Sequence, residues 1–440
     1  MYSHTTLSRK VRDLALWKKI CIVIFFMAFI RVGSNIPLPF VNRDYIRSLL
    51  DVDGLGFINS ITGGSMLQMS FFALSVSPYI TASIVIQLIT VLSPSLEEMR
   101  KDGKTGMDKY KKITNITGVV LGFVQAAAMA VGLGRNGLLD PFNWKTVVLA
   151  TIIWSIGGAV IILIGMFLDM LEIGNGISMI LFCNIVASIP SDIVKIFEFA
   201  SVKNRAGMII TCIMANLLAL ALVYVSTVCQ ETEKRITITQ TRKGYRGPDS
   251  VFPIPFLTCS VMPVIFAGSI MSFPIMIAQF VPKLQDGIFG KCIRMLNTSM
   301  WFNADMPIYT FGAVLYVGLT VLFTYFYLDI GFNAYEIADN LKKQGAVIPG
   351  IRTGKPTAEL IDKISKKVAI RGNMAMVGII LFTYMVCNMT GIGSVSIAGT
   401  SCFILVNVAI EEYKLAAANM RAKLARNRNG FVLAKLVKSI

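Results

Sequence analysis

The sequence predicts an all-α membrane protein with ten transmembrane helices. The 440-residue chain is 55% hydrophobic, its apolar residues gather into about ten long stretches, and its basic residues fall mainly on alternate loops. A hydrocarbon core of about 30 Å requires about 20 apolar residues in a crossing helix, so each stretch can cross once. The predicted spans are residues 20–40, 71–92, 113–133, 146–168, 177–197, 207–229, 251–281, 307–328, 368–389 and 392–410.

The positions of the basic residues predict the orientation of these spans. With the N-terminus in the cytoplasm, and with Lys195 and Arg371 at span ends counted with the adjoining loops, 31 of the 42 Lys and Arg residues lie on cytoplasmic segments and 10 on outside loops. Arg31 lies within the first span. The positive-inside rule therefore places both termini in the cytoplasm. Topology and anionic lipid together account for the net charge of +17, so that charge does not predict a DNA partner.

Composition argues against the common catalytic and metal-binding classes. His4 is the only histidine, which is too few for a histidine-based metal site or a Ser-His-Asp triad, and the eight cysteines include no C-x-x-C pair. The phosphate-binding pattern GxxxxGK[ST] does not occur in the sequence. We therefore expect no enzyme activity, no cofactor and no metal. No small-residue cleavage site follows the first apolar stretch, so we expect it to be retained as a helix.

The segment FINSITGGSMLQMS, residues 57–70, differs from the spans around it. Its 14 residues would make about 21 Å of helix, which is too short to cross. Asn59, Gln68 and the Gly63–Gly64 pair would be costly to expose to lipid tails. The residues alone leave two interpretations open: a half-helix that faces protein or water, and a loop that lies at the outer interface.

Charged residues are nearly absent from the interiors of the spans, where ion-coupled transporters usually carry them. Arg31 is the exception in the first span. We expect its side chain to snorkel or to bind backbone carbonyls beside the Pro37–Pro39 end of that span. A coupled transporter is therefore disfavoured.

Three longer polar segments lie on the basic side of the predicted topology, at residues 94–112, 230–250 and 329–367. The last is interrupted by Gly345, Pro349, Gly350 and Pro356, which predicts a projecting hairpin with a turn near 349–356. The outside loops are shorter and carry fewer charges. Function is therefore expected in the helical bundle or on its cytoplasmic face.

From Arg31 onward the chain resembles the SecY family, the channel subunits of the bacterial protein translocon. The resemblance is carried, in order along the chain, by RVGSNIPLP, FFALSVSPYITASIVIQLITVL, GNGIS, VMPVIFAGSI, FTYFY, FNAYEIADNLKKQGAVIPGIRTGKPTAELID and AGTS. It implies two five-helix halves around a central pore that opens across the membrane and sideways into lipid. The expected organisation is a cytoplasmic tail (1–19), a first half (20–206), a second half (207–413) and a basic cytoplasmic tail (414–440).

The resemblance also implies roles for individual residues. A ring of aliphatic side chains would close the pore, at Val76, Ile80, Ile177, Leu181, Ile265 and Ile404. Residues 57–70 would form a plug that seals the resting channel, with Phe57, Ile58, Ile61, Gly63, Gly64, Met66 and Leu67 as its apolar and glycine positions. From the residues alone, the six ring positions are equally well explained as ordinary helix packing, because Ile and Val fill every span.

A lateral gate would lie between the second and seventh spans, with Ser83, Gln87, Leu257 and Thr258 as its matching residues. Relatives usually carry an asparagine where this chain has Leu257, so the closed gate is expected to depend more on apolar packing. Simple packing of the bundle explains Ser83 and Gln87 equally well. Docking of a ribosome or motor would use Arg242, Lys243 and Arg352, because Arg can clamp phosphate or carboxylate in a bidentate way.

The function implied by the resemblance is a passive channel for unfolded, signal-bearing polypeptides that also releases hydrophobic segments sideways into lipid. Expected partners are SecE-like and SecG-like small membrane subunits, the SecA motor, the ribosome, the polypeptide substrates and membrane lipids, and no DNA. The expected location is the bacterial plasma membrane. A secondary transporter of small solutes is the alternative, and a scaffold or receptor subunit is a third hypothesis.

Overall fold

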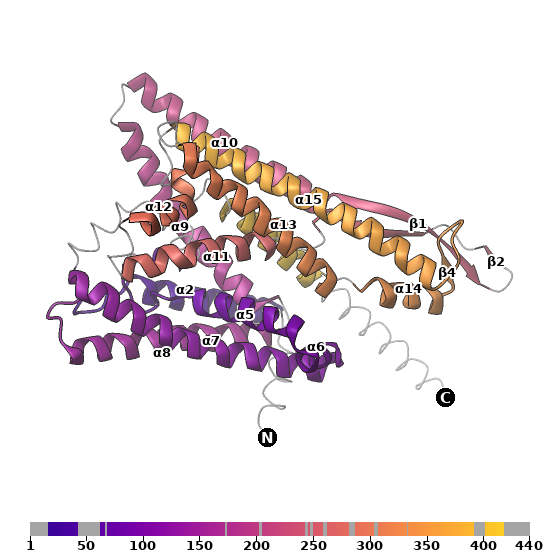
Figure 1. Ribbon diagram of the computed structural model, residues 1–440, viewed down its shortest axis with the longest axis horizontal. Helices are drawn as coiled ribbons and strands as arrows, with labels where there is room; N and C mark the ends of the chain where they lie inside the picture. The colour runs from indigo at the N-terminus through magenta and orange to yellow at the C-terminus, as the bar shows by residue number, and fades with distance from the viewer. Residues whose placement is uncertain are drawn as a thin grey trace. The chain divides into compact units, whose positions relative to one another are not determined.

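The computed structural model describes residues 16–42, 62–66, 68–171, 174–201, 205–242, 245–246, 250–257, 262–280, 287–302, 307–331, 333–390 and 401–417 (Figure 1). The chain divides into two compact units. Unit 1 contains residues 1–191, 279–282 and 408–440, and unit 2 contains residues 192–278 and 283–407.

Unit 1 is built from helices. The long ones are α2 (Leu16–Asn35), α5 (Ser77–Leu92), α7 (Gly103–Leu133), α8 (Trp144–Asp169) and most of α9 (Gly176–Ser201), and the short ones are α6 (Pro94–Lys101) and η1 (Gly134–Leu138). Pro78 lies in the first turn of α5, where a missing N–H costs nothing. At the other end of α5 the chain bends by 112° into α6, which begins at Pro94.

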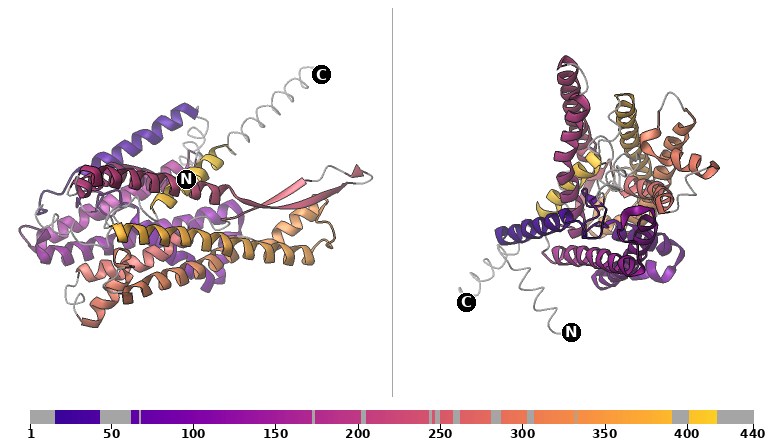
Figure 2. Two further views of the ribbon diagram at one scale, coloured as in Figure 1. Left: turned by 90° about the horizontal axis from the view of Figure 1, so that it is seen from above. Right: turned by 90° about the vertical axis from the view of Figure 1, so that its left-hand side faces the viewer.

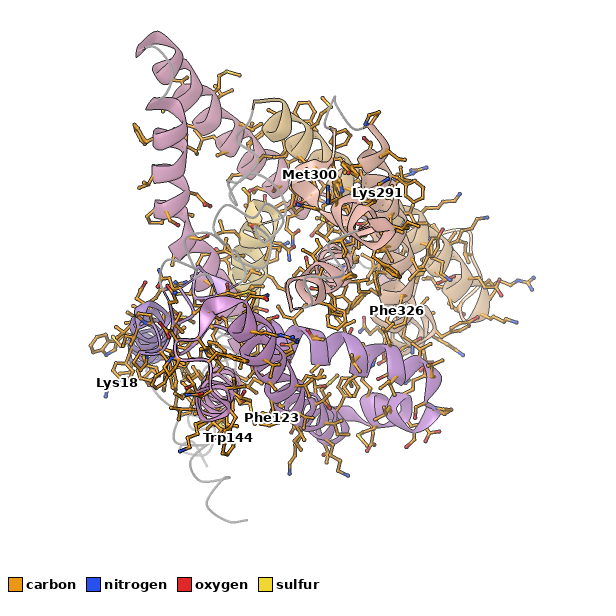
Figure 3. All side chains as sticks on the ribbon, turned by 60° about the vertical axis from the view of Figure 1, so that its left-hand side comes forward. Lys18, Phe123, Trp144, Lys291, Met300 and Phe326 are labelled. Carbon is orange, nitrogen blue, oxygen red and sulfur yellow. The ribbon has the colours of Figure 1, made fainter. Side chains whose placement is uncertain are left out.

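The core of unit 1 lies where α7 and α8 pack against the chain that connects α2 to α5. Trp154 of α8 is fully buried there, together with Met69 and Met129. The opposite side of the α7–α8 pair is apolar but exposed, as Figure 3 shows at Phe123 and Trp144, whose side chains are 54% and 73% exposed. An exposed apolar face is expected for helices that contact lipid, with a tryptophan at the membrane surface.

The long helices of unit 2 are α10 (Arg205–Glu231), α11 (Met262–Phe280), α13 (Phe311–Gly331) and α15 (Lys355–Thr390). Shorter elements are α12 (Gly287–Leu296), η3 (Thr298–Met300), η4 (Pro307–Thr310) and α14 (Ala334–Lys343). Another helix covers 401–417 and passes from unit 2 into unit 1. Asn333 caps α14 by accepting a hydrogen bond from the Glu336 N–H, which satisfies one of the free donors in its first turn.

A small sheet in unit 2 joins two of the predicted cytoplasmic loops. Its strands are β1 (Glu233–Arg242), β2 (Tyr245–Arg246), β3 (Ser250–Pro255) and β4 (Ala346–Val347). β1 pairs antiparallel with all three others, and the register places Ile236 opposite Phe252 and Gln240 opposite Ala346. Ile238, Ile254 and Ile361 form its core with residues of α14 and α15. Figures 1 and 2 show β1, α14 and the N-terminal part of α15 lying together at one end of the unit.

In the part of the chain that the structure describes, a helix covers at least part of each of the ten stretches predicted as spans, but the count of ten crossings is not confirmed. Within the described residues, six helices are long and apolar enough to cross a membrane, or seven if the bent α5–α6 pair is one span. The apolar part of α11 is shorter, at Met262–Ile275, and the described part of the last helix is 401–417. Two boundaries were wrong: the predicted span 251–281 begins with strand β3, and the predicted loop 329–367 includes the first turns of α15.

Candidate functional site

Four of the predicted ring residues lie in unit 1, at the starts of two helices. Val76 immediately precedes α5 and is fully buried, and Ile80 follows in the first turn of α5. Leu181 of α9 is 5% exposed. Ile177, also on α9, packs against α8, because a Cβ placed on Gly165 would lie 2.4 Å from its Cδ1 atom. In unit 2, Ile265 of α11 and Ile404 of the last helix are buried.

The last two residues of the predicted plug, and the chain that leads from them to α5, are held by hydrogen bonds to neighbouring segments. The N–H of Leu38 donates to the Met69 carbonyl (3.3 Å), and the N–H of Phe71 donates to the Ile36 carbonyl (3.1 Å). From α8, the indole N–H of Trp154 donates to the Ser70 carbonyl (3.1 Å). We call residues 69–76 the connector. It holds Val76 at a defined position at the start of α5.

The described part of the predicted plug, 62–66 and 68–70, is not helical beyond Thr62 but runs through turns. The half-helix predicted over this part is therefore wrong, because Gly63 and Gly64 both adopt positive φ angles, of 64° and 85°. Thr62, Ser65 and Met66 are buried, so this part of the segment faces protein. Phe57, Ile58, Ile61 and Leu67 lie outside the described residues.

Arg31 makes contacts that sequence reasoning did not identify. We expected carbonyls near Pro37–Pro39, but the guanidinium instead reaches the plug and α9. Its Nη1 donates to the Gly63 carbonyl (2.9 Å), and its Nη2 donates to the Asn184 side-chain oxygen (3.1 Å) and backbone carbonyl (3.2 Å). Asn184 gave no signal in the sequence because one buried amide in an apolar helix has no distinctive pattern.

The predicted gate residues of α5 contact each other. The Gln87 side-chain amide donates to the Ser83 hydroxyl at 2.7 Å, one helical turn away. In unit 2, Leu257 is 8% exposed in the turn after β3. Thr258 lies outside the described residues.

Two of the three predicted docking residues lie in or near the sheet of unit 2. Arg242 is the last residue of β1, two positions beyond Gln240, which pairs with Ala346 of β4. Arg352 is exposed in the turn between β4 and α15, and its carbonyl accepts a hydrogen bond from the Thr357 hydroxyl (2.8 Å). The strand pairing thus joins the two loops in one rigid structure. Lys243 lies outside the described residues.

The turn between α8 and α9 carries no basic residue of its own, and side chains from other helices hold it. The Lys19 ammonium of α2 donates to the Leu171 carbonyl, and Lys111 of α7 pairs with Asp169 (3.1 Å). From the last helix, Glu412 accepts a hydrogen bond from the Asn175 N–H (2.9 Å). These long-range contacts anchor the last helix to this turn, and sequence reasoning missed them because the residues are far apart in the chain.

Burial, with a smaller contribution from the nearby Glu411 and Asp169, raises the pKa of Glu412 to about 6, although the hydrogen bond from the Asn175 N–H acts to lower it. Glu412 lies beyond the last predicted span. Because its pKa in the folded protein exceeds the ordinary value, its contribution to stability is complete below about pH 4.5 and is lost as the pH rises through about 6. We expect Glu412→Gln to flatten that part of the pH dependence of thermal stability in detergent. Solvent screening limits the difference to under about 1 kcal/mol.

The exposed Glu359→Gln on α15 is the control for this experiment, since it removes a carboxylate without touching the turn. An unchanged pH profile in Glu412→Gln would contradict the prediction.

Within the described ranges, no group of three or more His, Cys, Asp or Glu residues could hold a metal ion. In unit 1, the candidate site consists of apolar side chains at helix starts, a glycine-containing buried segment, and one arginine that connects that segment to α9.

Comparison with known proteins identifies the family. The SecY family model matches residues 70–413. The protein translocase subunit SecY of Bacillus subtilis (strain 168) is 31% identical over 444 residues, which cover 97% of this chain and 99% of that protein.

Two solved structures have the same fold. The structure of a protein conducting channel matches with a TM-score of 0.69 at 15% identity, over 91% of both chains. Sec61 in the canine ribosome-channel complex from the endoplasmic reticulum matches with a TM-score of 0.64 at 15% identity, also over 91% of both chains. The family match and the full-length relative together show that this multi-pass membrane protein belongs to the SecY family.

Proposed function

We propose that this chain is a passive channel through which unfolded, signal-bearing polypeptides cross the membrane, and from which hydrophobic segments move sideways into lipid. The observation that carries the proposal is the family match over residues 70–413, which includes helices of both units. Membership in a family of translocase subunits, rather than any missing motif, is the reason to assign transport and not catalysis.

The chemistry of the predicted ring suits this function. Val76, Ile80, Ile177, Leu181, Ile265 and Ile404 are all branched aliphatic residues without hydrogen-bonding groups. A narrow apolar neck loses its water and so blocks ions, but its side chains can yield to a polypeptide of any sequence. Such a ring would seal the channel without selecting among substrates. Energy for movement would come from SecA or from a translating ribosome.

Crosslinking of a stalled substrate tests this function. A secretory chain arrested during transport should crosslink to a photoreactive amino acid placed at Ile80 or at Ile404, one in each unit. The same probe at Ile89, an exposed position on α5, should give little product. Equal crosslinking at Ile80 and Ile89 would contradict a central path.

A transporter of small solutes is not supported by the similar proteins. Arg31, in the interior of the first predicted span, binds backbone carbonyls and an amide oxygen, and the carboxylate of Asp192 lies near the end of the predicted span 177–197. Neither places a carboxylate in the interior of a span, where proton or cation coupling would need one. Retention of transport of an unfolded polypeptide in vesicles without any ion gradient but with the motor would separate the two functions.

We also propose that the end of unit 2 that contains the sheet, α14 and the start of α15 docks the ribosome or the SecA motor. One solved structure of this fold is a canine ribosome-channel complex, which supports a ribosome as a partner. Arg352→Glu should weaken binding of ribosomes or of SecA to the purified channel by at least about tenfold, because it reverses a charge at an exposed turn. Binding is measured by co-sedimentation or fluorescence titration.

Lys355→Glu is the matched control, because Lys355 is exposed three residues further on, at the start of α15. Equal loss in both variants would show a general charge effect and would contradict a specific role for Arg352.

The proposed setting is the bacterial plasma membrane, with both termini in the cytoplasm and with SecE-like and SecG-like subunits beside the channel. α10 supports such lateral contacts, because Leu217, Leu220 and Tyr224 are 62%, 71% and 71% exposed. Side chains of this kind are covered by lipid or by an apolar helix of another subunit.

A further inference from the structure

Arg31 joins three parts of unit 1. It belongs to α2, its Nη1 donates to the Gly63 carbonyl of the buried plug segment 62–66, and its Nη2 donates to Cys183 and Asn184 of α9. A planar guanidinium can donate in two directions at once without changing its rotamer. This one side chain therefore fastens the segment to both helices.

The charge of Arg31 is held by neutral oxygen atoms. Its four acceptors are carbonyl or amide oxygens, and its buried Nε–H has no acceptor in the part of the chain that the structure describes. Hydrogen bonds that involve a charged donor are stronger than neutral ones, but a buried charge without a counterion pays for its dehydration. The contact is thus specific in geometry and limited in strength, which suits a contact that must open.

Gly63 fits this contact closely. A Cβ atom at Gly63 would lie 2.2 Å from Arg31 Nη2 and 2.8 Å from the Asn184 carbonyl oxygen. The adjacent Gly64 has a similar positive φ, but its Cβ would meet nothing within 4 Å. The plug segment therefore approaches α9 at Gly63 specifically, and Gly64 provides a control with the same backbone strain.

Asn184 extends the contact to the predicted ring. Its side-chain oxygen accepts from Arg31, while its amide donates to the Ser75 hydroxyl at 2.8 Å. Ser75 directly precedes Val76, and Leu181 lies three residues before Asn184, on the same face of α9. The hydrogen bond between Asn184 and Ser75 thus joins a residue adjacent to Val76 with a residue one helical turn from Leu181.

The two ends of the described plug segment are held differently: the connector has its own hydrogen bonds, and Arg31 contacts the segment at Gly63. Residues 69–71 are bonded to Ile36, Leu38 and Trp154. By contrast, the bonds of the Ser65 hydroxyl, to the Thr62 and Phe72 carbonyls, join the segment to itself and to the connector. If the Arg31 bonds break, residues 62–66 can leave α9 while the connector stays in place.

We propose that Arg31 is a latch: a positioning residue that holds the plug segment 62–66 against α9 in the resting channel, and that Asn184 couples this latch to the ring through Ser75. The proposal rests on the proposed function, in which residues 57–70 are the plug. A passing polypeptide that separates α2 from α9 would break the bonds to Gly63 and Asn184 together. Release of the plug and loosening of the ring would then occur as one event.

The test measures two properties of the full-length protein with its small subunits in lipid. The first is resting ion conductance in planar bilayers, and the second is hydrogen–deuterium exchange of amides 62–66. Arg31→Gln should raise the frequency of conducting events and the exchange rate of these amides roughly tenfold or more, because it removes charge-assisted hydrogen bonds. Arg31→Lys should give values between those of the unmodified protein and Arg31→Gln, since an ammonium group cannot make the two-directional hydrogen bonds of the planar guanidinium. Exchange in α7 should not change.

The glycine pair tests the same contact without removing the arginine. Gly63→Ala should open the segment, whereas Gly64→Ala, with the same strain and open space, should have a much smaller effect. This pair decides the question if Arg31→Gln fails to fold, which faster exchange throughout α7 would reveal. Equal behaviour of Gly63→Ala and Gly64→Ala, or exchange at 62–66 unchanged in Arg31→Gln, would overturn the latch.

Deletion of residues 57–70 separates this proposal from the function on which it rests. A leak from the deletion but none from Arg31→Gln, with unchanged exchange, overturns the latch and leaves the plug function standing. Faster exchange in Arg31→Gln without a leak from either variant supports the contact and overturns the sealing role of the plug.

Discussion

An Ile80→Asn channel is expected to conduct ions in the absence of any polypeptide. The predicted ring has no hydrogen-bonding side chain, so its neck stays dry at rest. An asparagine there would bind water, and lowering the free energy of wetting by about 2 kcal/mol would raise the hydrated fraction roughly thirtyfold. Single-channel recording of the reconstituted complex measures this as more frequent openings at rest.

Ile89→Asn provides the control on the same helix. Ile89 is 42% exposed on α5 and lies about two and a half turns after Ile80, on the opposite face of the helix, so the same substitution there should not wet the pore. If Ile80→Asn remains as tight as the unmodified channel while folding normally, the ring does not include Ile80.

Gly157→Ala is expected to destabilise unit 1 and to disturb the connector. A Cβ atom at Gly157 would lie 2.1 Å from the Phe71 carbonyl oxygen, which is backbone and cannot rotate away. Forcing extra volume into such a site typically costs about 1–3 kcal/mol. Because Trp154 holds the neighbouring Ser70 carbonyl, the strain should reach Val76 as well.

Gly158→Ala is the matched control, since its Cβ would approach only Pro78, at 4.0 Å. Alanine favours a helix over glycine by about 1 kcal/mol, so this variant should be neutral or slightly more stable. Thermal unfolding in detergent compares the two, and crosslinking at Ile80 reports the position of α5. A stable Gly157→Ala protein with normal transport would show that the connector can shift freely.

Hydropathy predicted the long helices and their order, but not the short helices α6, α12 and α14. The stretches 113–133 and 146–168 became α7 and α8, because backbone groups in a long apolar segment can be satisfied only within a helix. The same reasoning could not find the sheet. β1 lies in a loop that reads as polar, and its longest-range partner, β4, is only two residues long and more than a hundred positions away.

The resemblance to SecY motifs predicted which residues to consider as ring, plug, gate and docking positions. It did not predict what holds them. The residues left open a half-helix and an interfacial loop for the plug segment, and its described part instead runs through turns at two glycines with Thr62, Ser65 and Met66 buried. The link from Arg31 through Asn184 to Ser75 joins residues that are up to 153 positions apart, and no local pattern marks such a set.

The sequence by itself determined the membrane class, the family and the helices, since these depend on local hydropathy, charge and motif order. Only the tertiary structure decided which polar groups meet inside unit 1. A lone buried arginine or asparagine must satisfy its hydrogen bonds, but it can do so with any carbonyl that folding brings within reach. That choice is made by the packing of distant helices, and here it connects α2, the plug and α9.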